Sequence, residues 1–189
     1  MKLIYNFWYF LFCSNCMDII RYVKNEEHYA LLMDQVNKVK HTLWIGTADL
    51  KDLYVKSLSS TATPFLQLLE EKVKEKVAIR LIHAKEPGTN FRADFDKYPL
   101  LWTGVERVLC PRVHFKILVF DMQSVYIGSA NMTGAAFGMK STKTRNFEAG
   151  IFTEVPELVE SAVEQFDEVW MGKHCKECGR KLFCGDRVV

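Results

Sequence analysis

Hydrophobic residues recur along the chain with two spacings, and each spacing indicates a type of element. The apolar residues of segment 64–76 follow the three- and four-residue steps of an amphipathic helix. Short runs rich in Val, Ile, Leu and Phe, bounded by polar residues, predict buried strands instead. These patterns predict helices over Glu26–Lys40, Pro64–Lys76 and Pro156–Trp170, and strands over Thr42–Thr47, Val77–His83, Val113–Phe120, Val125–Ile127 and Asn146–Thr153.

The order of these elements predicts a single α/β domain, because helices that alternate with strands pack as layers on a central sheet. The chain has 189 residues, of which 49% are hydrophobic, which is enough for one substantial core. We expect this domain over residues 17–173. An apolar extension over 1–16 precedes it, and a cysteine-containing tail over 174–189 follows it.

Six residues of fixed type and spacing stand out in and after the run HFKILVFD: His114, Lys116, Asp121, Gly128, Ser129 and Asn131. Asp favours the first position of a type I turn, so we expect a four-residue hairpin loop over 121–124. Counting back along both strands predicts two facing pairs, Lys116 with Ser129 and His114 with Asn131. Side chains alternate faces with a period of two, so these four would share one face. A slip by one residue would separate them.

These residue types suit a site that handles phosphate. An imidazole can attack phosphorus or deliver a proton, and an ammonium neutralises non-bridging oxygens. A carboxamide and a hydroxyl add oriented donors, and together these groups need no metal. The alternative is that His114 and Lys116 only decorate a solvated sheet face.

The string H-x-K-x4-D-x6-G-S-x-N from His114 to Asn131 resembles the motif of the phospholipase D superfamily, a group of phosphodiester-cleaving enzymes. The resemblance implies an α/β fold in which helices sandwich a mixed central sheet. It also implies a covalent route in which the His of one motif attacks phosphorus, the His of a second motif protonates the leaving oxygen, and water releases the intermediate.

This chain contains one such motif, although the mechanism needs two. At His83-Ala84-Lys85, Asn90 stands where the Asp should be and no Gly-Ser-x-Asn follows, so we interpret this stretch as a strand end. His174-Cys175-Lys176 also fails, since Lys181 occupies the Asp position. We therefore expect a homodimer in which two copies of His114 face each other across a two-fold axis.

Two carboxylates are further site candidates. The family places a carboxylate downstream of its Asn, and Glu148 takes that position here, where it would accept a hydrogen bond from the ring of His114. An ordinary exposed strand Glu is the alternative. Asp121 completes the motif and is included among the catalytic candidates. Strand parity directs it to the opposite face, which favours a role in pinning the turn.

The formal net charge of +2 does not by itself identify a nucleic-acid binder, so the distribution of charge matters more. Six basic residues fall in the strands and the loop expected around the site, and a dimer would double their charge. They are Arg107, Arg112, Lys116, Lys140, Lys143 and Arg145. Scattered, solvated surface charge is the alternative interpretation.

Three functions compete on this evidence. The first is a metal-independent endonuclease, with nucleic acid as the partner and DNA ahead of RNA. The second is a phospholipase or phosphatidyltransferase that acts on phospholipids, for which a basic amphipathic membrane helix would be expected. The third is a non-catalytic nucleic-acid-binding module, for which a nucleophile such as His114 has little use.

The tail contains Cys175, Cys178 and Cys184 in a C-x2-C-x5-C spacing that suits part of a structural zinc site. Catalysis itself would require no cofactor. A fourth ligand would come from His174 or, through tertiary contact, from Cys110, His28 or the pair Cys13 and Cys16. Buried thiols or disulfides are the alternatives.

The N-terminal run Leu3–Cys13 is apolar but shorter than the roughly 20 residues that span a bilayer. It could form the core of a signal sequence, or Met17 could be the true start. We expect a cytoplasmic protein, or a secreted or periplasmic one if residues 1–16 act as a signal.

Overall fold

The computed structural model describes residues 19–51, 54–56, 62–137, 141 and 143–186. Their strands form a seven-stranded mixed sheet and a separate two-stranded ribbon. In spatial order the sheet contains β1 (Ile20–Lys24), β9 (Ala149–Thr153), β8 (Ser124–Gly128), β7 (Ile117–Phe120), β2 (Thr42–Thr47), β5 (Ala78–His83) and β6 (Val105–Leu109). The ribbon pairs β3 (Tyr54–Lys56) with β4 (Ala62–Pro64). Strands β2, β5 and β6 are parallel, and the other pairs are antiparallel.

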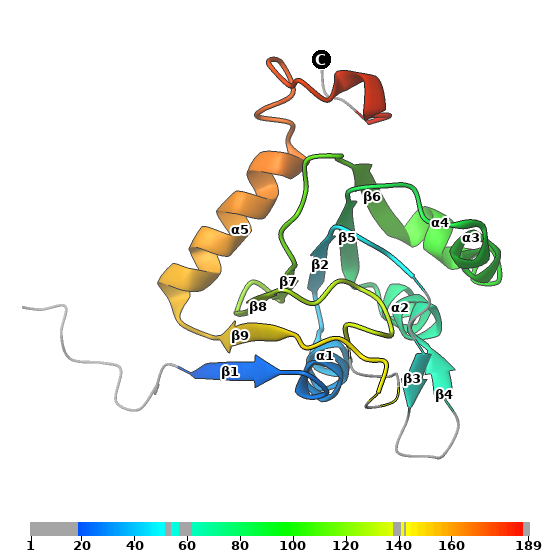
Figure 1. Ribbon diagram of the computed structural model, residues 1–189, viewed down its shortest axis with the longest axis vertical. Coiled ribbons are helices and arrows are strands. Elements are labelled where there is room, and N and C mark those ends of the chain that lie inside the picture. The colour runs from blue at the N-terminus through cyan, green and yellow to red at the C-terminus, as the bar shows by residue number, and fades with distance from the viewer. Residues whose placement is uncertain (1–18, 52–53, 57–61, 138–140, 142, 187–189) are drawn as a thin grey trace, which may run out of the picture.

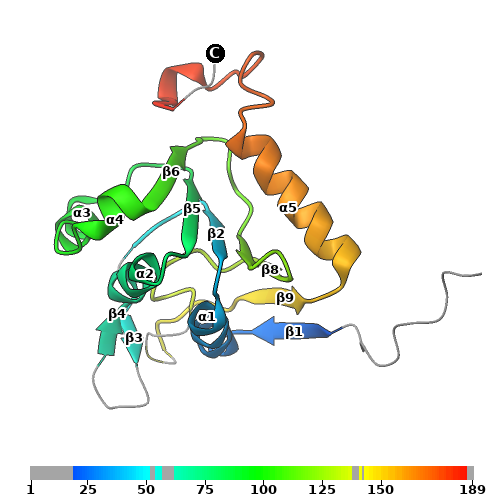
Figure 2. The same ribbon diagram turned by 180° about the vertical axis from the view of Figure 1, so that it is seen from behind.

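Helices cover both faces of this sheet (Figures 1 and 2). On one face lie α1 (Glu27–Lys38) and α2 (Phe65–Lys74), together with the short α3 (Thr89–Phe95) and α4 (Leu100–Gly104). The long α5 (Pro156–Trp170) covers the other face, and a 3-10 turn, η1 (Lys181–Phe183), lies in the tail. The predicted α/β class, with a mixed sheet sandwiched between helices, is confirmed.

Alternation along β2 explains why the sheet carries two hydrophobic cores. Leu43 and Ile45 point into the core beneath α1 and α2, whereas Trp44 points toward α5. On that second face Trp44 stacks on Phe166, with ring centroids 4.9 Å apart. Phe166 is completely buried, so the middle of α5 is fixed against the sheet.

The predicted bounds of β2 and α5 are correct, and α1, α2 and β5 differ from their predictions only at the ends. Strands β1, β3, β4 and β6, with the short α3 and α4, were not predicted. Strands β1 and β6 form the edges of the sheet, and charged residues interrupt their apolar residues, as in the sequence VERVL of β6, so they lack a continuous apolar run. Residues 1–16 lie outside the described residues. Within the described part, every helix falls short of the length and apolarity needed to cross a membrane.

The predicted hairpin register is wrong by one residue. Phe120 pairs with Ser124 and Ile117 with Ile127, so a three-residue connection, 121–123, replaces the expected four-residue loop. Asp121 and Met122 adopt positive φ angles of 50° and 57°, a left-handed conformation that Asp tolerates better than most residues. This backbone turns the chain in fewer residues than the predicted type I loop.

Asp121 fastens this hairpin to the connection between α1 and β2. Its carboxylate accepts hydrogen bonds from the backbone amides of Lys40 (2.8 Å), His41 (2.7 Å) and Thr42 (2.8 Å). Burial by itself would raise the pKa of the carboxyl, but these three donors outweigh it and hold the pKa below its usual value. The Asp of the motif therefore acts as a structural clamp between the hairpin and the chain before β2.

We expect Asp121→Ala to lower the free energy of unfolding by at least about 2 kcal/mol, because it leaves three amides without their charged acceptor. Asp121→Asn keeps one acceptor oxygen and tolerates positive φ, so it should lose less. Urea denaturation of the three proteins would measure the differences. A loss below about 0.5 kcal/mol for Asp121→Ala would contradict the clamp.

His28 of α1 is buried in the core, where its ring packs edge-on against Tyr126 and Phe137. Its Nδ1 lies 2.8 Å from the carbonyl of Asn25. Desolvation lowers the pKa of His28, and the Asn25 carbonyl and nearby Glu148 offset this only in part. The folded protein therefore takes up a proton at His28 less readily than the unfolded chain does.

This difference predicts a pH effect on stability. Above about pH 6.5, His28 is neutral in both states, but below it the unfolded chain binds a proton that the folded state rejects. His28 should thus reduce the free energy of unfolding by at most about 1.4 kcal/mol per pH unit as the pH falls. The stability advantage of the wild type over His28→Gln, measured by urea denaturation, should shrink between pH 7.5 and pH 5.5. A constant difference would exclude this titration.

Candidate active site

The motif residues gather at one edge of the sheet, where β8 ends and β7 and β9 begin. Antiparallel pairing of β7 with β2 brings Gly46 opposite Ile117, so the next pair outward is Thr47 with Lys116. On the other side of β7, Gly128 donates its amide to the carbonyl of Lys116 at 3.1 Å. The site is therefore built from strand ends that the hairpin holds together.

His114 and Lys116 form the centre of this edge. The Lys116 ammonium donates to the backbone carbonyl of His114 at 2.7 Å and lies 3.4 and 3.5 Å from its two ring nitrogens. Lys116 is buried, which lowers the pKa of its ammonium, while Glu148 acts to raise it. The His114 side chain is exposed, so an imidazole open to solvent stands beside a largely buried cation.

Ser129 and Glu148 form a second cluster at the same edge. The Ser129 hydroxyl donates to one carboxylate oxygen of Glu148, and the Asn146 amide donates to the other at 3.0 Å. Among the described residues, the partners of the Glu148 carboxylate are Ser129 and Asn146, and the expected hydrogen bond to the ring of His114 is not formed. Because both carboxylate oxygens already accept hydrogen bonds, Glu148 orients Ser129 and places a negative charge near Lys116.

Asn25, which precedes α1, holds Glu148 in place and was not predicted from the sequence. Its amide donates to the carbonyl of Glu148 at 3.0 Å, and its side-chain oxygen accepts from the Glu148 amide at 3.2 Å. Asn25 has a φ of 49°. An Asn before a predicted helix indicates a turn, but its partner 123 residues away cannot be inferred from spacing.

Asn131 is held by Thr47, a second residue that the sequence did not identify. The Thr47 hydroxyl donates to the side-chain oxygen of Asn131 at 3.4 Å and accepts from the amide of Met132 at 3.1 Å. The side-chain oxygen of Asn131 thus faces Thr47, and its side-chain NH2 group points away from Thr47. The predicted pairing of His114 with Asn131 and of Lys116 with Ser129 is replaced by the shifted register.

A steric constraint explains why Gly128 of the motif has no side chain. A Cβ at Gly128 would lie 2.1 Å from the hydroxyl of Tyr126, and one at Gly150 would lie 2.4 Å from a carbon of the same ring. Strands β8 and β9 therefore need Gly at these two positions, because any larger residue would overlap the Tyr126 ring.

Asp121 and His83 lie apart from this cluster. Asp121 follows the far end of β7, roughly 20 Å along the strand direction from His114, so the structure does not bring it together with the other predicted site residues. His83 is buried at the end of β5, with Nδ1 2.8 Å from the carbonyl of Lys85, and Lys85 pairs with Asp49. The interpretation of His83-Ala84-Lys85 as a strand end is confirmed.

The predicted basic patch is smaller than expected. Arg107 lies at the opposite side of the sheet over the rings of Phe95 and Trp102, and Arg145 pairs with Glu26 at 3.1 Å. Lys140 lies outside the described residues. Lys116, Arg112 and the exposed Lys143 remain as the described basic candidates.

The predicted zinc ligands of the tail do not form a coordination set as they stand. In the part of the chain that the structure describes, no three His, Cys, Asp or Glu side chains are grouped closely enough to hold one metal ion. His174 pairs with Glu168 at 3.3 Å, and the described cysteines are unpaired thiols.

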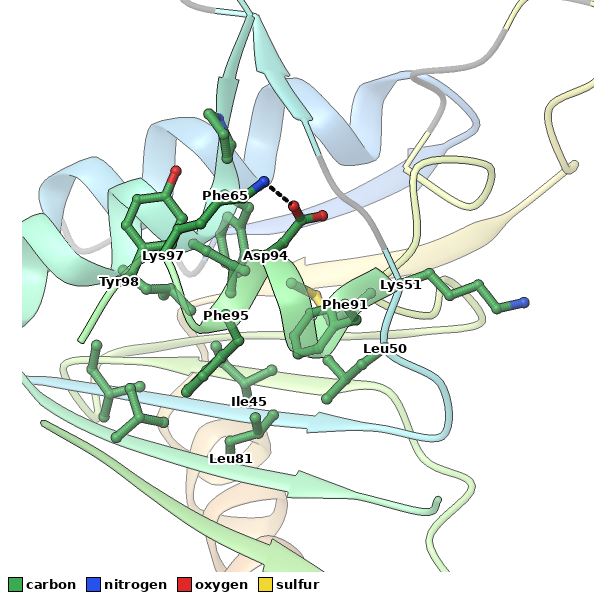
Figure 3. Close-up of a pocket in the computed structure, with 16 residues that line it drawn as sticks. Ile45, Leu50, Lys51, Phe65, Leu81, Phe91, Asp94, Phe95, Lys97 and Tyr98 are labelled. Carbon is green, nitrogen blue, oxygen red and sulfur yellow. Dashed lines mark hydrogen bonds and ion pairs between the residues drawn. The ribbon is translucent and has the colours of Figure 1, made fainter. Parts of the chain in front are cut away.

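An apolar cavity of about 70 Å³ lies between the sheet and the helices α2 and α3 (Figure 3). Its walls include Ile45, Leu81, Phe65 and Phe95, and Lys97 pairs with Asp94 at 2.7 Å beside it. It adjoins the site through Leu50, which bridges to Met132, the residue after Asn131. The volume is well below the roughly 300–1,000 Å³ of sites for small molecules.

Chemically, the edge can bind a tetrahedral anion and attack it. The imidazole of His114 is accessible, the ammonium of Lys116 can neutralise developing negative charge, and Asn131 and Ser129 offer polar groups nearby. One copy of His114 can act as nucleophile or as acid, but not as both at once. The catalytic roles of these residues stay predictions.

Comparisons with known proteins agree with this description. The family model described as cardiolipin synthase, PLD-like domain, matches residues 32–170. No curated protein matches the sequence significantly. Among solved structures, the fold is similar to Nuc from Salmonella typhimurium, a phospholipase D family member, with a TM-score of 0.60 and 16% identity over 82% of this chain and 95% of that chain.

Two further structures share the fold. NucT from Helicobacter pylori has a TM-score of 0.58 and 14% identity over 81% of this chain and 97% of that chain. TrmBL2, an archaeal chromatin protein described as having a novel mode of DNA binding, has a TM-score of 0.53 and 13% identity over 84% of this chain and 54% of that chain. Since the family match covers most of the sequence, the chain belongs to the phospholipase D superfamily, whose members act on phosphodiester bonds.

Proposed function

We propose that the protein is a metal-independent endonuclease that cleaves nucleic-acid phosphodiester bonds in an active site shared by two identical subunits. The observation that carries the proposal is the exposed imidazole of His114 beside the buried ammonium of Lys116, with Ser129 and Asn131 at the same sheet edge. A nucleophile next to a fixed cation is the minimum that attack on a phosphodiester requires.

The proposed reaction has two steps. In the first, a ring nitrogen of His114 forms a bond to phosphorus while the bond to the leaving oxygen breaks, and the other subunit's copy of His114 gives that oxygen a proton. In the second, the same acid, now a base, takes a proton from water, and the resulting hydroxide displaces His114. The products are an alcohol and a phosphate monoester, and both imidazoles return to their starting states.

Glu148 supports this chemistry indirectly in the proposal. Its carboxylate fixes the hydroxyl of Ser129 and places a negative charge near Lys116, while Asn25 fixes its backbone. Ser129 and Lys116 can then contact the non-bridging oxygens without reorganisation, which is the condition for strong electrostatic stabilisation.

An exposed apolar row beside the site supports self-association. Tyr22, Ile151 and Ile127 lie opposite one another on β1, β9 and β8, with 64%, 43% and 39% of their surfaces exposed. Phe147, next to Glu148, is 92% exposed. We propose that a second copy covers this row, because a two-fold interface uses the same patch on both subunits and brings two motifs together.

Nucleic acid is the substrate that we favour, with DNA ahead of RNA. The nucleophile is exposed at a sheet edge, where a long polyanion can reach it, and Arg112 and Lys143 are exposed cations in the same region of the sequence. The DNA binding described for TrmBL2, a protein of similar fold, gives further support for DNA as the class of ligand.

Phospholipid is the second candidate, because the matching family model is described as a cardiolipin synthase domain. A diacyl lipid needs an apolar surface for its chains. The apolar cavity next to Asn131 is about 70 Å³, which is too small for an acyl chain. In this proposal the second subunit covers the exposed apolar row, so we place phospholipid after nucleic acid.

We expect His114→Ala to reduce cleavage of plasmid DNA in the presence of a chelator by at least about 10³-fold, because the covalent step is lost. His41→Ala, which removes another exposed histidine far from the site, is the matched control and should retain full activity. The assay is nicking and linearisation on agarose gels. Headgroup release from phospholipid vesicles, measured in parallel, distinguishes the second candidate.

The proposal fails if the wild type cuts neither DNA nor RNA in chelator. Headgroup release without nuclease activity would identify a lipid enzyme. Nucleic-acid binding with no phosphorylated protein after acid quenching would indicate a binding module.

We expect the double substitution Ile127→Arg and Ile151→Arg to convert a dimer into monomers and to abolish activity, since charges would be buried against their own symmetry copies. Sedimentation velocity measures the association state, and circular dichroism checks the fold. Ile19→Arg, which alters an exposed apolar residue outside the row, is the control. An active monomer would exclude the shared site.

A further inference from the structure

Four cysteines from distant parts of the sequence lie at one end of the molecule. Cys110 follows β6, and Cys175, Cys178 and Cys184 belong to the tail, drawn in red in Figure 1. The thiol of Cys184 donates to the carbonyl of Leu109 at 3.4 Å, and the Leu109 amide donates to Asp186 at 2.7 Å. The tail is thus folded back onto the residue that precedes Cys110.

The other two tail thiols face the same region. Cys178 donates its amide to the carbonyl of Cys175 at 3.2 Å, and the thiol of Cys178 accepts from the amide of Arg180 at 3.4 Å. Cys110, Cys175 and Cys178 line a common pocket of about 240 Å³, and Cys110 interacts electrostatically with all three tail cysteines.

We propose that Cys110, Cys175, Cys178 and Cys184 are the four ligands of a thiolate-bound metal centre that joins the tail to the catalytic domain. Four thiolates in one place select either a zinc ion or an iron–sulfur cluster. This set differs from the tail cysteines alone, because the fourth ligand comes from the end of a sheet strand.

The two occupants place different demands on the thiols. A single zinc ion needs all its sulfur ligands about 2.3 Å from one point. No three described Cys, His, Asp or Glu side chains meet this condition as they stand. A [4Fe–4S] cluster binds each thiolate to a different iron atom, and a [2Fe–2S] cluster divides the four thiolates between two irons, so the ligands of a cluster surround a larger space than those of one zinc ion. Arg112 and Lys181 add positive charge beside Cys178, which offsets the charge of the thiolates.

The centre would also stabilise the approach to the candidate active site. Cys110 lies four residues before His114, and the amide of Val113 donates to the Cys110 carbonyl at 3.0 Å in the intervening turn. A metal bound at Cys110 would fix one end of the segment that carries His114. The inference does not depend on nuclease activity, because metal content is measured independently of turnover.

The test is metal and sulfide analysis of the full chain, purified under anaerobic and reducing conditions. Iron with an equal amount of acid-labile sulfide and broad visible absorption would identify a cluster. One zinc ion per chain without sulfide would identify zinc. Either result supports the four-thiolate centre and distinguishes the two occupants.

Single variants Cys110→Ser and Cys184→Ser should each lose most of the bound metal, although they lie 74 residues apart in sequence. The double variant Cys13→Ser and Cys16→Ser is the matched control, since it removes two cysteines that are not in the proposed set, and it should retain the metal. Limited trypsin digestion gives a second readout: cleavage in the tail at Lys176, Arg180 or Lys181 should accelerate when the metal is lost.

Three results would overturn the inference. The first is a wild-type protein that contains neither metal and binds neither Zn²⁺ nor reconstituted iron and sulfide after reduction. The second is retention of the full metal content by folded Cys110→Ser. The third is a mass decrease that shows disulfides among these four cysteines in protein purified without reductant, with no metal regained on reduction.

Discussion

The pairing of β7 between β2 and β8 is the interaction on which both the fold and the candidate site depend. All four residues of β7 are buried, and its backbone groups find partners in the two neighbouring strands. Because β7 runs antiparallel to β2, the residue before its start lies at the edge where β2 ends. Lys116 is therefore buried beside Thr47, and an ammonium at that depth is costly unless a nearby negative charge compensates it. Glu148 supplies that charge in the protein, and an anionic substrate would add to it.

Two carboxylates serve the opposite ends of this hairpin in different ways. Asp121 accepts hydrogen bonds from three backbone amides and fixes the turn against the chain before β2, so these amides compensate its negative charge. Glu148 accepts from two side chains and lies near a cation, so its charge acts on the site. The motif places Asp121 among chemically reactive residues, yet its hydrogen bonds connect it to the scaffold. A residue of the family motif can thus stabilise the backbone that carries the site.

His114 lies between two anchors on the same stretch of chain. On its C-terminal side, Lys116 is fixed by the sheet and donates to the His114 carbonyl. On its N-terminal side, the turn at Cys110 contacts the tail through Leu109. The imidazole itself is exposed, which suits a nucleophile that must meet a large substrate, while the backbone on both sides is held. Rigid support with an accessible side chain is the arrangement that positioning in catalysis requires.

The class of fold, the helices and strands with continuous apolar patterns, and the motif of the family could all be predicted from the amino-acid sequence. Each of these depends on residues close together in the chain, such as the run that forms β2 or the helical spacing of α5. The hairpin register could not be predicted in this way, because Asp121 and Met122 adopt left-handed conformations that their residue types do not require. The tertiary structure also decided the partners of Glu148, which are Ser129, Asn146 and Asn25 rather than His114. The physical reason is that local patterns report burial and periodicity, whereas the partners of a side chain depend on how distant segments pack.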